Sequence, residues 1–195
     1  MKKLTLLLLT LVFATSAFAQ TPAAAKPAPP PPPTMAQILD RELTGVEHEV
    51  VPLAEAMPAD KYDFKPSGEG FKDVRTFKQQ IGHIAAVLHI FAAPLIGEEA
   101  ATGLTDKDEL NGPASLKTKD DYVKFLKDGF ARAHRAIATI NEKNYNEMVQ
   151  NKIMNFSLAR LRVATLLSSH CFDHYGQLVV YLRMNNIIPP ASRPK

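Results

Sequence analysis

Two histidines, His170 and His174, stand one helical turn apart in an otherwise apolar run from Ser169 to Pro190. At about 100° per residue they lie about 40° apart around a helix, so both imidazoles belong to one stripe. Two neutral imidazoles at this spacing can converge on one divalent cation, as helical histidine pairs do in zinc enzymes. The spacing suits two polar residues at a helix interface equally well. A third ligand is needed to decide between these interpretations.

A third ligand could come from His83 or His89, which share a second predicted helix. They lie about 120° apart around it, so only one can easily face a partner helix. Gln79 and Gln80 beside His83 suggest the polar lining of a cavity, although apolar residues surround both histidines. Position alone leaves the choice between them open.

The two remaining histidines fit a metal site less well. His48 lies roughly opposite the apolar stripe of its helix, so we expect it to face solvent. His134 flanks an apolar stripe about 75° from its centre, which favours a residue at the boundary between core and surface. Neither histidine is assigned a role.

Apolar residues at helical spacing predict four helices, over residues 34–57, 73–96, 118–140 and 157–185. Thr34 with Gln37 forms a capping box for the first helix, and Thr118 with Asp121 opens the third. Ser157 is a plausible cap for the fourth, which Pro189 and Pro190 follow.

The segment from Asn141 to Asn155 is polar, and we expect it to be irregular with a short helical turn around Tyr145–Met148. No run alternates apolar and polar residues for long enough to support a sheet. The sequence therefore predicts an all-α four-helix bundle, with a metal site between its second and fourth helices.

Residues 1–19 have the pattern of a secretory signal peptide. Lys2 and Lys3 precede an apolar run from Leu4 to Phe13, and Ala17 and Ala19 form an A-x-A cleavage site. The run is too short to span a membrane, and we expect no later segment that is apolar for long enough. We expect an exported protein, periplasmic or secreted, with no membrane span.

Residues 20–33 are rich in proline and alanine, which predicts an extended linker before a single domain at 34–190. Without the signal peptide the formal charge falls from +3 to +1, with 21 basic and 20 acidic residues. This balance gives no concentrated basic patch, so we expect no nucleic-acid partner. The single cysteine, Cys171, excludes an internal disulfide, and we interpret it as a packing residue rather than a nucleophile.

From about Leu53 to Pro190 the chain resembles the DinB-like superfamily of four-helix bundles. The ending HYGQLVVYLRMNNIIPP and the stretch DVRTFKQQIGHI are similar to that superfamily's last and second helices. The resemblance implies three metal ligands, which fall on His83, His170 and His174, and it selects His83 over His89. Tyr175 stands where arginine is frequent, and this could alter how an anionic substrate is held. Asn186 stands where glycine often ends the helix, and asparagine should tolerate the left-handed conformation there.

Three imidazoles would leave a coordination position open on a single divalent ion, which could be zinc, nickel, iron or manganese. The resemblance implies transfer to a small thiol or thiol-dependent isomerisation. Export weighs against a thiol partner and favours hydrolysis of a small molecule. Asp173 could orient an imidazole or simply be solvated, and Gln177 could contact a metal-bound ligand or form an interhelical hydrogen bond. The alternative to an enzyme is a non-catalytic stress protein that binds the metal or a small ligand.

Overall fold

The computed structural model describes residues 30–101, 103–104 and 110–194, without the side chain of Phe156. The chain divides into two units, Met1–Pro32 and Pro33–Lys195. In the first unit, residues 30–32 are exposed and have no regular secondary structure. The predicted signal peptide and most of the predicted linker lie outside the described residues, and both stay predictions.

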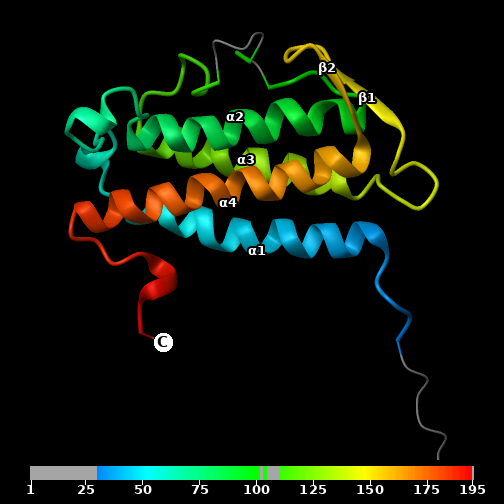
Figure 1. The fold of residues 1–195 in the computed structure, drawn as a ribbon, viewed down its shortest axis with the longest axis horizontal. Coiled ribbons are helices and arrows are strands. Elements are labelled where there is room, and N and C mark those ends of the chain that lie inside the picture. The colour runs from blue at the N-terminus through cyan, green and yellow to red at the C-terminus, as the bar shows by residue number, and fades with distance from the viewer. Residues whose placement is uncertain (1–29, 102, 105–109, 195) are drawn as a thin grey trace, which may run out of the picture. The chain divides into compact units, whose positions relative to one another are not determined.

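In the described part of the second unit, four long helices form a bundle (Figure 1). They are α1 (Met35–Ala56), α2 (Phe77–Ile96), α3 (Lys119–Ile137) and α4 (Arg160–Met184). Short 3-10 helices span Ala59–Lys61 (η1), Glu69–Phe71 (η2) and Pro190–Ser192 (η4). Both α1 and α2 pack against α3 and α4. The predicted four-helix bundle is confirmed.

Three of the long helices begin with a reciprocal cap. Thr34 and Thr118 cap α1 and α3 as predicted, through the residues three positions later. The predicted start of α2 near Asp73 is wrong, because Thr76 is the cap and the helix begins at Phe77. Thr76 Oγ1 accepts the Gln79 N–H at 3.3 Å, and Gln79 Oε1 accepts the Thr76 N–H at 2.8 Å. These bonds satisfy two backbone donors that a helix start leaves free.

Helix α2 is the most buried helix of the bundle and corrects one expectation. By length and composition alone it could cross a membrane, whereas no segment after the signal peptide was expected to be apolar for long enough. Most of α2 is buried against α3, α4 and a short strand, β1 (Met148–Asn151). It therefore satisfies the apolar criterion as the core helix of the bundle.

A β-hairpin precedes α4, where an irregular segment with a helical turn was predicted. Strands β1 (Met148–Asn151) and β2 (Phe156–Ala159) pair antiparallel, and Asn155 between them has a left-handed φ of 53°. Four-residue strands are too short for apolar alternation to identify them. Ser157 lies within β2 rather than at a cap, and Ala159 precedes the first residue of α4 without a side-chain cap.

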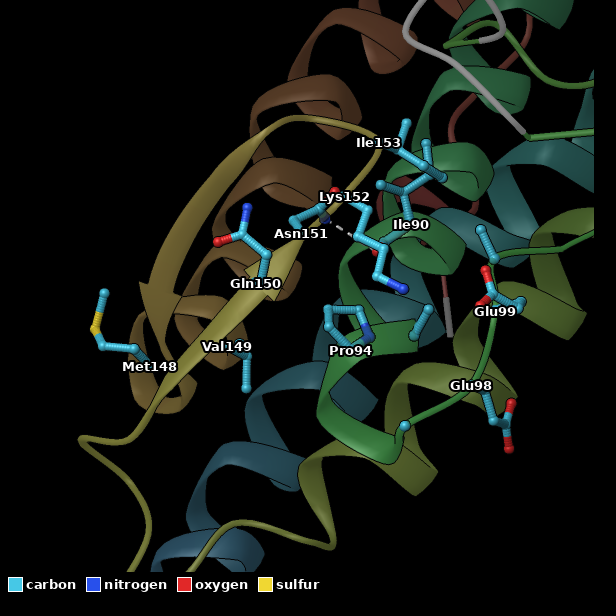
Figure 2. A pocket seen from close by; sticks show the side chains of 13 residues that line it. Ile90, Pro94, Glu98, Glu99, Met148, Val149, Gln150, Asn151, Lys152 and Ile153 are labelled. Carbon is cyan, nitrogen blue, oxygen red and sulfur yellow. Dashed lines mark hydrogen bonds between the residues drawn. The ribbon is translucent and has the colours of Figure 1, made fainter.

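One asparagine anchors this hairpin to α2. Pro94 has no N–H, so the Ile90 carbonyl one turn earlier has no helical donor. Asn151 Nδ2 donates to that carbonyl at 3.1 Å (Figure 2). Asn151 Oδ1 also accepts the Met154 N–H at 2.9 Å. A pocket of about 390 Å³ lies between the hairpin and the end of α2, with Lys152 and Glu99 among its lining residues.

Candidate metal centre

The structure brings His83 of α2 together with His170 and His174 of α4. One ring nitrogen from each lies within 4.8 Å of those of the other two. The ring centroids are 5.0 Å apart for His83 and His170, 4.8 Å for His83 and His174, and 4.5 Å for His170 and His174. Two elements far apart in the sequence thus place three imidazoles in one cluster, called the histidine cluster below.

A backbone carbonyl orients His83. Its Nδ1 donates to the Leu110 oxygen at 2.6 Å, and because a carbonyl can only accept, this fixes the proton on Nδ1. The loop can come this close because Gly82 has no side chain. A Cβ atom there would lie 2.1 Å from the Asn111 carbonyl oxygen. The absence of a side chain at residue 82 therefore lets the neighbouring loop hold a histidine of the cluster.

A side-chain amide orients His174 in the same way. Its Nδ1 donates to Gln80 Oε1 at 2.6 Å in the buried interface between α2 and α4. Gln80 Nε2 in turn donates to Gln177 Oε1 at 2.9 Å. Both His83 and His174 therefore keep their Nε2 lone pairs free of these bonds, which is the tautomer that metal-binding histidines commonly adopt.

The third histidine has a buried nitrogen without a partner. His170 Nε2 is inaccessible to solvent and has no hydrogen bond to any described residue. Leaving a buried polar atom unpaired is costly, so such atoms in folded proteins normally have a partner. A divalent cation held by three imidazoles would supply one. The residues present therefore fit a metal ion.

Burial keeps the cluster in its neutral, metal-binding form. Removal from water lowers the pKa of His83 to about 4 and that of His174 to about 3, and it also lowers the pKa of His170. In each case the positive charge of Arg75 lowers the pKa further. At neutral pH protons therefore compete little with a cation for these nitrogens.

The other three histidines lie outside the cluster. His48 is exposed on α1, as expected. His89 is buried, stacks on the Phe125 ring at 4.6 Å, and its Nε2 donates to the Phe125 carbonyl at 3.3 Å. His134 is half-buried at the edge of the core, between Asp40 and Glu47 of α1.

Asp173 and Gln177 are both exposed on α4. No hydrogen bond among the described residues joins Asp173 to an imidazole, although its charge raises the pKa of His170 against the larger lowering by burial. Gln177 forms the interhelical bond to Gln80 that was one of its two predicted roles. The residues that orient the histidines are instead Gln80, identified from the sequence only as a polar neighbour, and Leu110, which acts through its backbone and so has no side-chain signal.

Three further residues were singled out from the sequence. Cys171 is fully buried, and burial raises the pKa of its thiol to about 12, which agrees with a packing role. Tyr175 donates its hydroxyl to Glu49 of α1 at 2.7 Å. Asn186 has a left-handed φ of 58°, as expected for a residue in place of glycine after a helix.

A family model described as the DinB superfamily matches residues 42–178 of this chain. A DinB-like protein from Bacillus cereus superposes with a TM-score of 0.60 at 12% identity, over 78% of this chain and 93% of that one. The DinB-like protein YjoA from Bacillus subtilis superposes with a TM-score of 0.56 at 15% identity, over 81% of this chain and 99% of that one. At these identities the likeness shows the fold alone, and no curated protein matches the chain. The family match covers well over half of the sequence, so the protein belongs to the DinB superfamily.

Proposed function

We propose that this protein is an exported metalloprotein that binds one divalent ion through His83, His170 and His174 and uses it to hydrolyse a small molecule. One observation carries the metal-binding part. The buried Nε2 atom of His170 has no partner among the described residues. It lies beside two imidazoles whose Nδ1 protons are already donated to Gln80 and Leu110.

The number of ligands supports a reactive rather than a purely structural metal. Among the described residues, the group of potential ligands contains three histidines and no fourth ligand. Three protein ligands leave a position for water or substrate, whereas structural zinc sites usually fill four. Bound there, zinc, nickel, iron or manganese would lower the pKa of a coordinated water or thiol.

Hydrolysis is preferred to thiol transfer because of the expected export. Small thiol cofactors are abundant in the cytosol, and the pattern of residues 1–19 predicts that the mature chain leaves it. Mass spectrometry of protein from the cell envelope or medium should find a mature start at Gln20. An intact Met1 in a cytosolic fraction would favour the thiol transferase.

One observation favours a non-catalytic metal- or ligand-binding protein as the second candidate. No described carboxylate hydrogen-bonds to an imidazole of the cluster, and Asp173 faces solvent. A general base must reach the proton that it removes. A bound metal that exchanges no ligand with small anions or thiols would support this second candidate.

Metal analysis of the mature chain, purified without an affinity tag, tests the proposal. We expect about one divalent metal per chain in the wild type, because one three-ligand site is present. His83→Ala, His170→Ala and His174→Ala should each lose it, since each leaves two imidazoles. His89→Ala and His48→Ala are the matched controls and should keep it. Loss of metal in His89→Ala with retention in His83→Ala would overturn the assignment.

A further inference from the structure

Arg75 lies directly before Thr76, the residue that caps α2, and is tied to the elements that hold the histidine cluster. Its Nε donates to Asn111 Oδ1 at 2.7 Å, and its backbone carbonyl accepts the hydroxyl of Tyr181 at 2.9 Å. Asn111 belongs to the loop that packs on Gly82, and Tyr181 lies on α4 two turns after His174. The half-buried Arg75 is therefore held at its backbone carbonyl and at Nε.

Two short paths connect Arg75 to the histidines. Asn111 follows Leu110, whose carbonyl accepts the proton of His83. Tyr181 lies close enough to Gln80, the residue that orients His174, for the Gln80 amide to lower the pKa of Tyr181 against the larger raising by burial. The positive charge of Arg75 is close enough to act on all three imidazoles, although burial acts on them more strongly.

The charge of Arg75 has no carboxylate partner among the described residues. Several other cations are paired with carboxylates. Lys78 lies 2.5 Å from Asp63, and Arg132 and Arg135 both lie 3.0 Å from Glu98. The Nε atom of Arg75 has its bond to Asn111, whereas none of the hydrogen bonds between described residues uses its Nη groups. A guanidinium presents its N–H groups as a planar fork that matches an oxyanion.

We propose that Arg75 is the anion-binding residue of the metal centre, so that the site accepts a substrate with a carboxylate or phosphate group next to the metal-bound atom. This inference rests on the proposed metal site. Three neutral imidazoles leave the full charge of a divalent ion in place, and Arg75 adds a third positive charge. Asp173 offsets one of these charges from the exposed side of α4. An oxyanion is the ligand that complements the remaining positive charge.

A purely structural role for Arg75 makes a different prediction. If its task were to hold Asn111, and through Leu110 to hold His83, its removal would weaken metal binding itself. If Arg75 binds an anion, its removal leaves the metal in place and weakens the binding of the anion. Metal stoichiometry and anion affinity therefore have to be measured on the same variant.

The experiment uses the mature chain loaded with Co²⁺, whose visible absorption reports a change of ligand, titrated with inorganic phosphate and with acetate. In Arg75→Gln we expect one Co²⁺ per chain, as in the wild type, and a Kd for phosphate raised about tenfold or more, the loss of one charge-assisted contact. The Kd of Arg75→Lys for phosphate should fall between those of the wild type and Arg75→Gln. Lys78→Gln, which removes a cation already paired with Asp63, should bind phosphate like the wild type. Imidazole, a neutral ligand, should bind all four proteins equally.

Three results would count against the inference in distinguishable ways. Equal phosphate affinity in Arg75→Gln and the wild type overturns the role of Arg75 and leaves the metal site standing. Loss of Co²⁺ from Arg75→Gln assigns the residue to holding the loop, which also overturns the anion-binding role. A wild type that binds no Co²⁺ overturns the proposed metal site itself.

Discussion

Gln80 Oε1 lies 2.6 Å from His174 Nδ1, and this hydrogen bond between α2 and α4 decides which ring nitrogen of His174 faces the cluster. The amide cannot turn around freely, because its Nε2 donates to Gln177 at 2.9 Å. An amide oxygen only accepts, so the proton stays on Nδ1 and Nε2 keeps its lone pair. A residue of α2 thus prepares a histidine of α4 to bind a cation.

Replacing Gln80 with leucine should weaken metal binding by about 10- to 100-fold, the usual effect of removing a partner that orients a metal-binding histidine. The reason is that His174 would lose the acceptor that fixes its tautomer and ring orientation. Competition with a chelator of known affinity measures the change. Gln80→Glu keeps an acceptor at the same place and should retain the metal. Equal metal affinity in Gln80→Leu and the wild type would contradict the orienting role.

Gly82→Ala should destabilise the protein and weaken metal binding together. The new Cβ would lie 2.1 Å from the Asn111 carbonyl oxygen and 3.1 Å from the Tyr122 ring, so the loop has to move. Overpacking of this kind costs about 1–3 kcal/mol. Movement of the loop also withdraws the Leu110 carbonyl from His83. Denaturant unfolding and chelator competition measure the two effects.

Gly45→Ala is the matched control for Gly82→Ala. Gly45 is exposed within α1, and a Cβ there would meet no atom within 4 Å. Alanine should therefore leave metal binding unchanged and stabilise the helix by about 0.5–1 kcal/mol. If Gly82→Ala behaved like Gly45→Ala, the loop would not depend on the close approach to α2.

The helices and the pairing of His170 with His174 could be predicted from the sequence because both follow the helical period. The spacing of His170 and His174 alone places both on one stripe of a helix. Thr34 and Thr118 have the pattern of residues that cap the start of a helix. The choice of His83 over His89 needed the family resemblance. Periodicity could not decide it, because both histidines of α2 are buried among apolar residues.

The missed features depend on contacts between segments that the sequence keeps apart. The Leu110 carbonyl reaches His83 from a loop 27 residues away, and a backbone atom leaves no mark on residue type. The hairpin was missed because its strands have four residues each, and one of its anchors is the bond from Asn151 to Ile90. Such contacts are determined by tertiary packing rather than by local pattern.

Asn151→Ala should destabilise the protein by about 1–3 kcal/mol, because it leaves the Ile90 carbonyl without a donor. Pro94→Ala restores the N–H that the proline lacks. In the background of Pro94→Ala the cost of Asn151→Ala should therefore be smaller, with a coupling of about 1 kcal/mol. Unfolding of the four proteins of this double-mutant cycle measures the coupling. Additive effects would show that Asn151 does not replace the missing helical bond.

His134 should stabilise the fold more at acidic than at alkaline pH. Burial lowers the pKa of His134, but hydrogen bonds with Asp40 at 2.6 Å and Glu47 at 3.0 Å outweigh burial and raise the pKa above its usual 6.5. A group whose pKa is higher in the folded state binds its proton more tightly there. Its contribution is therefore complete below about pH 6.5 and is lost as the pH rises through the folded-state pKa.

The difference in unfolding free energy between the wild type and His134→Gln, measured from pH 5.5 to pH 9.5, isolates this contribution. Burial lowers the pKa values of His83, His89 and His174, so these groups make stability rise with pH, opposite to His134. Comparing the two proteins at each pH cancels their contribution. We expect the difference to be largest at pH 5.5 and to shrink as the pH rises. Glu47→Gln removes one of the two carboxylates and should move this decline to lower pH. A difference that stays constant with pH, or grows at alkaline pH, would show that protonated His134 does not bridge Asp40 and Glu47.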